Sequence, residues 1–258
     1  LGTHGRKRAG TGDEFWQYRP AQAGDGYRQI DWRRSGRSDG HFIRQTEWQA
    51  AQSVILGVDD AASMTFTGHA ARPAKLRRAQ TLAMALAILA VRGGERVGLT
   101  HLAEPPRGGS AQLMRLAQAL MDGHEPGDYG APKPQMMPVG SRAVFFSDFL
   151  GDPAAIEAVL GRAADREVRG ALVQVLDPDE EAFPYDGRTV FESMTGAIRF
   201  ETLKATALRD AYLDRLAARK ARLQEMCRRT GWRYHLQHTG DAAEPTLLWL
   251  YRALEKVR

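Results

Sequence analysis

Carboxylates and hydroxyls follow two short apolar runs of this sequence, and such side chains are ligands for hard cations. The first run, 54–58, is followed by Asp59 and Ser63, and the second, 143–147, is followed by Asp148. If both runs are neighbouring parallel strands, these residues lie at the edge of the sheet where α/β proteins bind their ligands. Asp59, Ser63 and Asp148 are therefore the candidate ligands of a Mg²⁺ site. An equal alternative is that Asp59 and Asp148 are structural strand-end residues, whose carboxylates accept backbone N–H bonds or cap the following helices.

The rest of the chain supplies the elements that would position these residues. Short apolar runs predict five buried strands, at 54–58, 97–102, 143–147, 171–176 and 232–236. Longer amphipathic patterns predict helices at 75–92, 111–121, 153–166, 204–229 and 246–257. Strands that alternate with helices predict an α/β fold, in which a mainly parallel sheet is flanked by helices on both faces.

The N-terminal segment does not follow this alternation. Residues 13–53 are rich in Trp, Arg, Gly and Asp, and we expect loops that lead into one long strand at 41–58. We therefore predict a β-rich N-terminal subdomain at 1–53 and an α/β domain at 54–258.

A second departure lies inside the α/β domain, near 184–201. Two strand-like runs, 188–192 and 197–201, are separated by Ser193, Met194, Thr195 and Gly196. A four-residue turn of this composition predicts a β-hairpin, added to the sheet or to its edge.

Composition narrows the function. The chain has 258 residues, of which 43% are hydrophobic, so a sizeable core is possible. The longest apolar stretch, 81–91, is much shorter than the roughly 20 residues of a membrane span, and the first residues lack a signal-peptide core. The single cysteine, Cys227, excludes an internal disulfide and favours a buried thiol in a reducing compartment, so we expect a cytoplasmic protein.

A net charge of +5 invites a nucleic-acid interpretation. However, the basic residues are interleaved with 31 acidic ones, and no zinc-finger or helix-turn-helix pattern accompanies them. Nucleic-acid binding remains an alternative, although we do not expect it.

The sequence also lacks common catalytic motifs: there is no G-x-S-x-G, P-loop or dinucleotide fingerprint. His235 and His238 are three apart on a predicted strand, so they should face opposite sides and not share a metal.

Several motifs resemble a known family. Asp59-x-Ala61-x-Ser63 resembles the Asp-x-Ser-x-Ser metal-ion-dependent adhesion motif of von Willebrand factor A domains. The segment 24–37 resembles the signature of the bacterial domain-of-unknown-function-58 family, which is von Willebrand factor A-like. Further motifs follow in the family's order: Glu14-Phe15-Trp16, Ser147-Asp148-Phe149, Asp177-Pro178-x-Glu180 and Thr195-Gly196.

The resemblance implies a von Willebrand factor A-like, Rossmann-like fold with a β-rich insertion around the signature. It also implies a non-catalytic adaptor that works with a MoxR-type AAA+ ATPase or with other von Willebrand factor A proteins. The adhesion motif is incomplete, because the Ala61 side chain has no oxygen to offer a metal. The usual loop ligand is a threonine, but 124–140 contains none, and Ser110 is a poorly placed substitute for it. We therefore expect no cofactor, or weakly bound Mg²⁺ only.

Two questions stay open at this stage. The first is whether Asp59 and Asp148 serve a metal-dependent hydrolase such as a phosphoesterase, although no His or Glu general base is evident near them. The second concerns the signature cluster, whose members are Asp25, Arg28, Asp31, Trp32, Arg33 and Arg37. These residues suit a partner surface. They equally suit a structural knot, in which an Asp–Arg pair braces the loop and Trp32 fills a pocket, and we favour the knot.

Overall fold

The structure, a computed structural model, describes residues 9–22, 25–26, 30–36, 40–47, 51–122, 127–132 and 137–254. The chain divides into two compact units. One comprises Leu1–Gln52 with Gly93–Glu95, and the other comprises Ser53–Arg92 with Arg96–Arg258.

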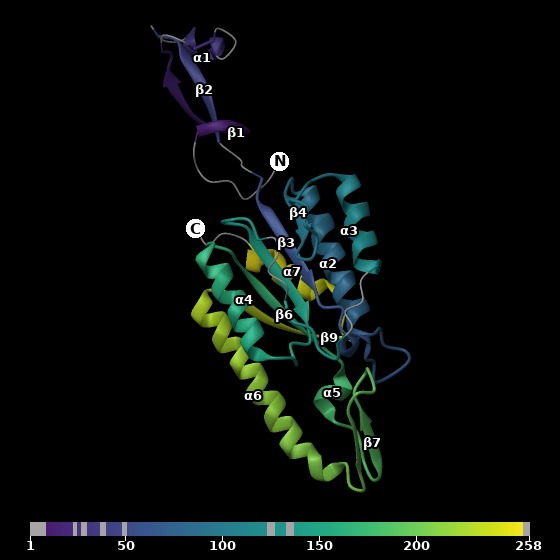
Figure 1. Cartoon of the computed structure of the whole chain (residues 1–258). Coiled ribbons are helices and arrows are strands. Elements are labelled where there is room, and N and C mark those ends of the chain that lie inside the picture. Colours follow the sequence, from purple (N-terminus) through teal and green to yellow (C-terminus); the bar gives the residue numbers. More distant parts are fainter. Residues whose placement is uncertain are drawn as a thin grey trace. The chain divides into compact units, whose positions relative to one another are not determined.

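The larger unit is built on a five-stranded parallel sheet (Figure 1). Its strands, in spatial order, are β4 (Arg96–Leu99), β3 (Ser53–Val58), β5 (Arg142–Ser147), β6 (Arg169–Leu176) and β9 (Arg233–His238). In chain order this is 2-1-3-4-5, a doubly wound arrangement whose direction switches between β3 and β5. The predicted fold class and all five predicted strands are confirmed.

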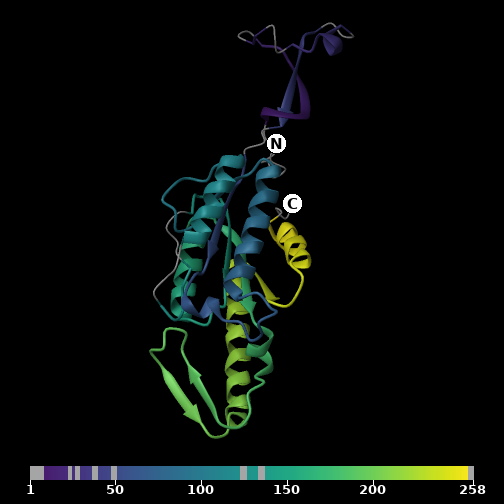
Figure 2. The same cartoon turned by 90° about the vertical axis from the view of Figure 1, so that its right-hand side faces the viewer.

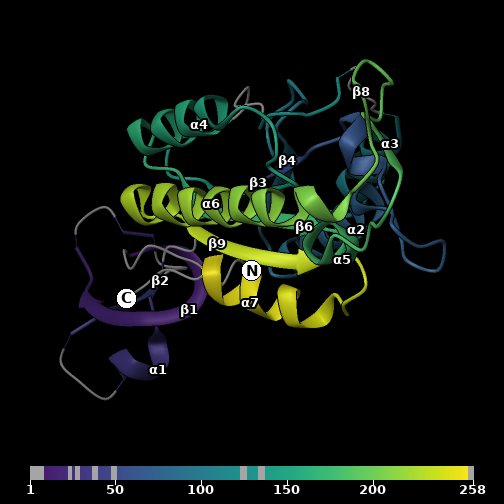
Figure 3. The ribbon, with the colours of Figure 1, turned by 90° about the horizontal axis from the view of Figure 1, so that it is seen from below.

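Helices cover both faces of this sheet. The helices α2 (Lys75–Arg92), α3 (Ser110–Asp122) and α7 (Glu244–Leu254) pack on one face. On the other face lie α4 (Pro153–Asp165) and α6 (Thr206–Thr230), and Figure 3 shows β9 between α6 and α7. All five predicted helices are present, with ends that differ from the prediction by one or two residues; the predicted end of the last helix, 257, lies outside the described residues.

Each central strand is buried on both sides, because helices cover both faces. Along β5, Val144 and Phe146 join the core beneath α2, whereas Ala143 and Phe145 join the core beneath α4 and α6. Phe145 also stacks on Trp232, with ring centroids 5.5 Å apart. Continuous apolar runs, without polar alternation, are what such strands require.

The predicted hairpin is confirmed as a separate two-stranded sheet. It consists of β7 (Thr189–Glu192) and β8 (Arg199–Thr202), which pair antiparallel before α6 begins (Figure 2). A short helix that the sequence did not predict, α5 (Pro178–Ala182), precedes it. Phe183 fixes the hairpin, since its ring lies 5.7 Å from that of Phe191 and 5.1 Å from that of Tyr212 in α6.

The smaller unit corrects the expectation for the N-terminal segment. Its long strand β1 (Ala9–Pro20) pairs antiparallel with β2 (Phe42–Glu47), and a short helix, α1 (Trp32–Ser35), lies between them. The expected loops from residue 13 are thus partly a strand. The expected single strand at 41–58 is wrong, because β2 pairs with β1 while β3 (Ser53–Val58) pairs within the parallel sheet.

Candidate functional site at the strand ends

Asp59 lies immediately after β3 and is held against the end of β5. Its backbone N–H donates to the carbonyl of Phe146 at 2.9 Å, which continues the parallel ladder by one residue. Its Oδ2 accepts a hydrogen bond from Ser147 Oγ at 2.5 Å, and its Oδ1 accepts one from the Ala61 N–H at 3.0 Å. The two strand ends are therefore joined through the Asp59 carboxylate.

Ser63, the next candidate ligand, lies in a 3-10 turn, η2 (Ala62–Thr65). Its side chain is buried, and its hydroxyl oxygen makes no hydrogen bond among the residues that the structure describes. Ala61 is fully buried and contributes no oxygen. The unsatisfied Ser63 hydroxyl is the only feature of this motif that suits an additional ligand, within the described part of the chain.

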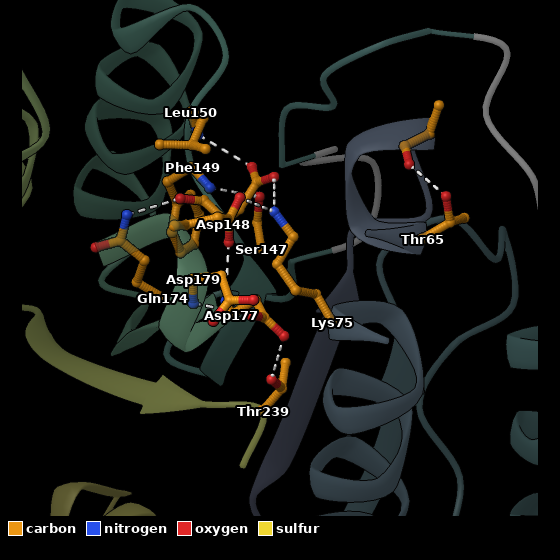
Figure 4. Close-up of polar contacts among 12 residues, drawn as sticks. Thr65, Lys75, Ser147, Asp148, Phe149, Leu150, Gln174, Asp177, Asp179 and Thr239 are labelled. Carbon is orange, nitrogen blue, oxygen red and sulfur yellow. Dashed lines mark hydrogen bonds and ion pairs between the residues drawn. The ribbon is translucent and has the colours of Figure 1, made fainter. Parts of the chain in front are cut away.

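Asp148 is fully buried one residue beyond β5, and its own chain uses both of its carboxylate oxygens (Figure 4). Oδ1 accepts the N–H of Leu150 at 3.0 Å, and Oδ2 accepts Lys75 Nζ at 2.9 Å. The Asp148 carbonyl accepts Gln174 Nε2 at 2.7 Å. The next residue, Phe149, has a φ of 51°, an uncommon left-handed conformation for a bulky residue. The contacts around Asp148 hold this strained turn in place.

Lys75, the first residue of α2, is fully buried and carries the positive charge of the site. Besides Asp148, its Nζ donates to Glu180 Oε1 at 2.7 Å and lies 5.7 Å from the centre of the Phe66 ring. Burial lowers the pKa of Lys75, but the charges of Asp148 and Glu180 outweigh burial and leave the pKa raised. The ammonium is therefore charged at neutral pH.

Glu180 is positioned by the motif Asp177-Pro178-x-Glu180. Asp177 caps α5, with its Oδ1 accepting the Asp179 N–H at 3.0 Å, and Glu180 Oε2 accepts the Asp177 N–H at 2.8 Å. This reciprocal capping box fixes the Glu180 side chain and turns its other oxygen toward Lys75. Thr239, after β9, adds a hydrogen bond of 2.9 Å to Asp177 Oδ2.

A loop lies against the same strand end. The carbonyls of Gly127 and Asp128 accept hydrogen bonds from the backbone of η2 at 2.9 and 2.8 Å. A Cβ added to Gly130 would lie 2.1 Å from Asp59 Oδ1, so the close approach requires glycine. The motif residue Thr195, in the hairpin turn, ties the hairpin to this loop, since its N–H and Oγ1 donate to Asp128 Oδ1 at 2.9 and 2.8 Å.

These donors do not fit the Mg²⁺ ligand set that the resemblance implies. Asp148 offers no carboxylate oxygen without a protein donor, and Ala61 offers none at all. Ser110 begins α3 as an exposed residue. Across the described parts of the chain, no three His, Cys, Asp or Glu side chains are grouped so that they could hold a metal ion.

The signature cluster is partly described. Asp25 forms two hydrogen bonds of 2.6 Å with the Arg19 guanidinium, which together with the Gln22 N–H lowers the pKa of Asp25 to about 2. Asp31 caps α1 by accepting the Arg34 N–H at 3.0 Å. An Asp–Arg pair thus braces the loop, as expected of the knot, and its arginine among the described residues is Arg19. Arg28 and Arg37 lie outside the described residues.

Trp32 does not fill a pocket, contrary to our expectation. Its side chain is 56% exposed, and its ring makes an edge contact with His41 at 5.5 Å. The bracing that we assigned to Trp32 comes instead from Arg34, whose guanidinium lies 5.5 Å from the centre of the Tyr18 ring and 5.7 Å from that of Phe42. Arg33, beside Trp32, is exposed.

The remaining sequence candidates behave as structural residues. Cys227 is buried, and burial raises the pKa of its thiol to about 12. His235 Nε2 lies 2.8 Å from Thr246 Oγ1, whereas the His238 ring contacts Glu181. The two histidines therefore share no site, as their spacing on a strand predicts.

Sequence reasoning missed Lys75, although one signal was available. A lysine in the first turn of a helix faces the positive end of the helix dipole, which is unfavourable without compensation. Asp148 and Glu180 supply that compensation, but they lie 73 and 105 residues away in the sequence.

The sequence matches the model of the family described as protein of unknown function DUF58, over residues 17–222. The chain belongs to the DUF58 family. No protein with a curated description matches it. Within the described residues, no helix combines the length and the apolar character needed to cross a bilayer.

Some solved structures are similar to this DUF58 chain, at low sequence identity. One is an aerotolerance-related membrane protein from Bacteroides fragilis, with 14% identity and a TM-score of 0.47, covering 79% of this chain and 98% of that one. Another is the conserved hypothetical protein BatB from Bacteroides thetaiotaomicron, with 12% identity, a TM-score of 0.46 and the same coverages. The SpRpn10 VWA domain shows 11% identity and a TM-score of 0.30, covering 77% of this chain and 94% of its own.

Proposed function

We propose that this DUF58 chain is a non-catalytic protein-interaction domain of the von Willebrand factor A type. In this proposal it acts in the bacterial cytoplasm with a MoxR-type AAA+ ATPase, and its metal-ion-dependent adhesion site is degenerate, binding Mg²⁺ weakly or not at all. The observation that carries the proposal is the buried contact of 2.9 Å between Lys75 Nζ and Asp148 Oδ2. This ion pair occupies one oxygen of the Asp148 carboxylate, on which metal binding would depend.

The alternative of a metal-dependent hydrolase gains no support from this geometry. Such an enzyme needs a ligand set with an open position and a general base beside it. Here Asp59 accepts hydrogen bonds from Ser147 and Ala61, and Asp148 is paired with Lys75. Both carboxylates serve contacts within the protein, which favours the non-catalytic proposal.

Nucleic-acid binding is likewise not favoured by the basic face of α6. Arg222 and Arg229 lie 3.6 and 3.7 Å from the Glu157 carboxylate of α4, and Lys220 contacts Glu181. Cations that pair with neighbouring acids form a mixed surface, not the basic stripe that tracks a phosphate backbone.

The test is capture of the chain by an immobilised MoxR-type ATPase, in a format that does not depend on ATP. We expect capture to persist in EDTA, because recognition would use side-chain contacts and not a bridging cation. Trp32 lies in the N-terminal unit, and Tyr129 lies in the loop whose residues Asp128 and Gly130 approach η2 and Asp59; Trp32 and Tyr129 are 56% and 53% exposed. Trp32→Ala and Tyr129→Ala therefore report which of these two regions the partner uses. Leu248→Ala, at an exposed position of α7, is the matched control.

Two results would contradict the proposal. The absence of capture from any folded ATPase of this type, with or without Mg²⁺, would remove the partner. Capture that EDTA abolishes and Mg²⁺ restores, with the ATPase still folded, would show that a cation bridges the complex and that the adhesion site is intact.

A further inference from the structure

Lys75 brings a fixed positive charge to the strand ends where the adhesion-site resemblance implies a metal ion. Its Nζ lies 2.9 Å from Asp148 Oδ2 (Figure 4). It also lies 2.7 Å from Glu180 Oε1. We propose that this ammonium takes the place of the divalent cation, so that the chain carries its own cation at the site. The inference rests on the degenerate adhesion site of the proposed function and identifies what replaces the metal.

The ammonium joins three elements, as a metal ion at this position would. Lys75 begins α2, which connects β3 to β4. Asp148 follows β5, and Glu180 belongs to α5, which follows β6. These elements meet beyond the carboxyl ends of the strands, beside the switch point between β3 and β5 where ligands of such sheets bind.

The ammonium and a metal ion exclude each other at Asp148. A Mg²⁺ ion bound to Asp148 Oδ2 would lie about 2 Å from that oxygen and hence within about 5 Å of Lys75 Nζ. Like charges at such a distance repel strongly in a buried site, where water does not screen them. The other oxygen, Oδ1, accepts one hydrogen bond from the Leu150 N–H, which holds the carboxylate in this orientation. A divalent cation at Oδ2 therefore requires Lys75 to leave.

Truncation of Lys75 should turn the site into a metal site. Lys75→Ala removes the ammonium and opens a buried space between two carboxylates, those of Asp148 and Glu180, whose oxygens are suitable ligands for Mn²⁺. Lys75→Met also removes the charge, but its side chain occupies the space. The pair of variants thus separates loss of the charge from the opening of a cation site.

The experiment compares these variants with the unmodified chain by thermal unfolding and by calorimetric titration with Mn²⁺. The unmodified chain should show no Tm shift in millimolar Mn²⁺. We expect Tm to fall by roughly 6–20 °C in Lys75→Ala, because two buried carboxylates lose their cation. Mn²⁺ should restore much of that loss, with at least about tenfold tighter binding than to the unmodified chain. Lys75→Met should lose stability without recovery.

Lys220→Ala is the matched control, since Lys220 also contacts an acidic residue of α5, Glu181, but is partly exposed. It should gain no Mn²⁺ binding. Equal Mn²⁺ affinity in the Lys75→Ala variant and the unmodified chain would overturn the proposal, as would a Tm rise of the unmodified chain in Mn²⁺ that Asp148→Asn abolishes.

A measurement on the unmodified chain covers the case in which Lys75→Ala does not fold. A buried, ion-paired ammonium exchanges its protons slowly, so its Nζ–H correlation should be visible by NMR at neutral pH and unchanged by millimolar Mg²⁺. Disappearance or a large shift of that signal on addition of Mg²⁺ would overturn the proposal. Neither experiment uses a partner protein, so failure to find an ATPase partner is a separate result.

Discussion

Two clusters of charged residues differ in how deeply they are buried. The first is the strand-end cluster of Lys75, Asp148 and Glu180, and the second is the N-terminal signature cluster. At the strand ends, Lys75 and Asp148 are fully buried, and both carboxylate oxygens of Asp148 have protein donors. In the signature cluster, the pair of Arg19 and Asp25 keeps side-chain exposures of 29% and 17%, and Trp32 is more than half exposed. One ion pair is buried, and the other is partly exposed to solvent.

This difference in burial determines how strongly each ion pair stabilises the structure around it. Moving an ion pair out of water costs several kcal/mol per ion, so a buried pair persists only when every charge has its partner. An arrangement of that kind tolerates little change, because the loss of one partner leaves the other charge buried and unpaired. A pair that keeps its contact with solvent contributes much less to stability. The predictions below test this contrast, beginning with the strand ends.

The largest effect is expected from Asp148→Ala. It leaves the Lys75 ammonium buried with Glu180 as the one remaining carboxylate among its described contacts, and it removes the acceptor of the Leu150 N–H. Breaking a buried pair in this way costs about 3–5 kcal/mol of unfolding free energy, which urea denaturation measures.

Asp152→Ala provides the comparison for that variant. Asp152 caps α4 from an exposed position, so its loss should cost only about 0.5–2 kcal/mol. If both variants lose the same small amount, the strand-end pair is not the tightly buried cluster described above, and the contrast between the two regions disappears.

The sequence could place Asp59 and Asp148 together because topology alone brings the ends of adjacent parallel strands to one edge. It could not identify Lys75, whose role depends on contacts 73 and 105 residues away. It recognised Asp177-Pro178-x-Glu180 as a motif but not the capping box that aims Glu180, because α5 is too short for a periodic signal.

The N-terminal unit shows a different limit. An aromatic, Arg-rich segment predicts contacts among its residues but not which of them are covered, so Trp32 was assigned to a pocket that Arg34, Tyr18 and Phe42 do not provide. Likewise, a run of strand-forming residues does not show where one sheet ends and another begins. For this reason the sequence predicted one strand where the structure has two, β2 and β3, in different sheets.

Two tryptophans extend the comparison, because their substitutions should differ strongly in their effect on stability. Trp232 is buried and stacks on Phe145, so Trp232→Ala should cost about 3–5 kcal/mol in urea unfolding. Trp32→Ala should change stability by less than about 0.5 kcal/mol, because the side chain is largely exposed. A cost for Trp32→Ala comparable to that for Trp232→Ala would return Trp32 to the role of a structural brace.

The smallest effect concerns the pH response of the signature cluster. The Arg19 guanidinium and the Gln22 N–H lower the pKa of Asp25 from 3.8 to about 2. A carboxyl whose pKa is lowered on folding stabilises the folded state above its unfolded pKa, and that contribution is lost as the pH falls toward 2. An NMR titration of the Asp25 carboxyl should therefore show a midpoint near 2, and Arg19→Gln should raise the midpoint toward 3.8. Because the pair is partly exposed to solvent, high salt should narrow the difference in midpoint between the two proteins. A midpoint near 3.8 in the unmodified chain would mean that the Arg19–Asp25 contact does not persist in solution, and the signature loop would then lack the ion pair that organises it.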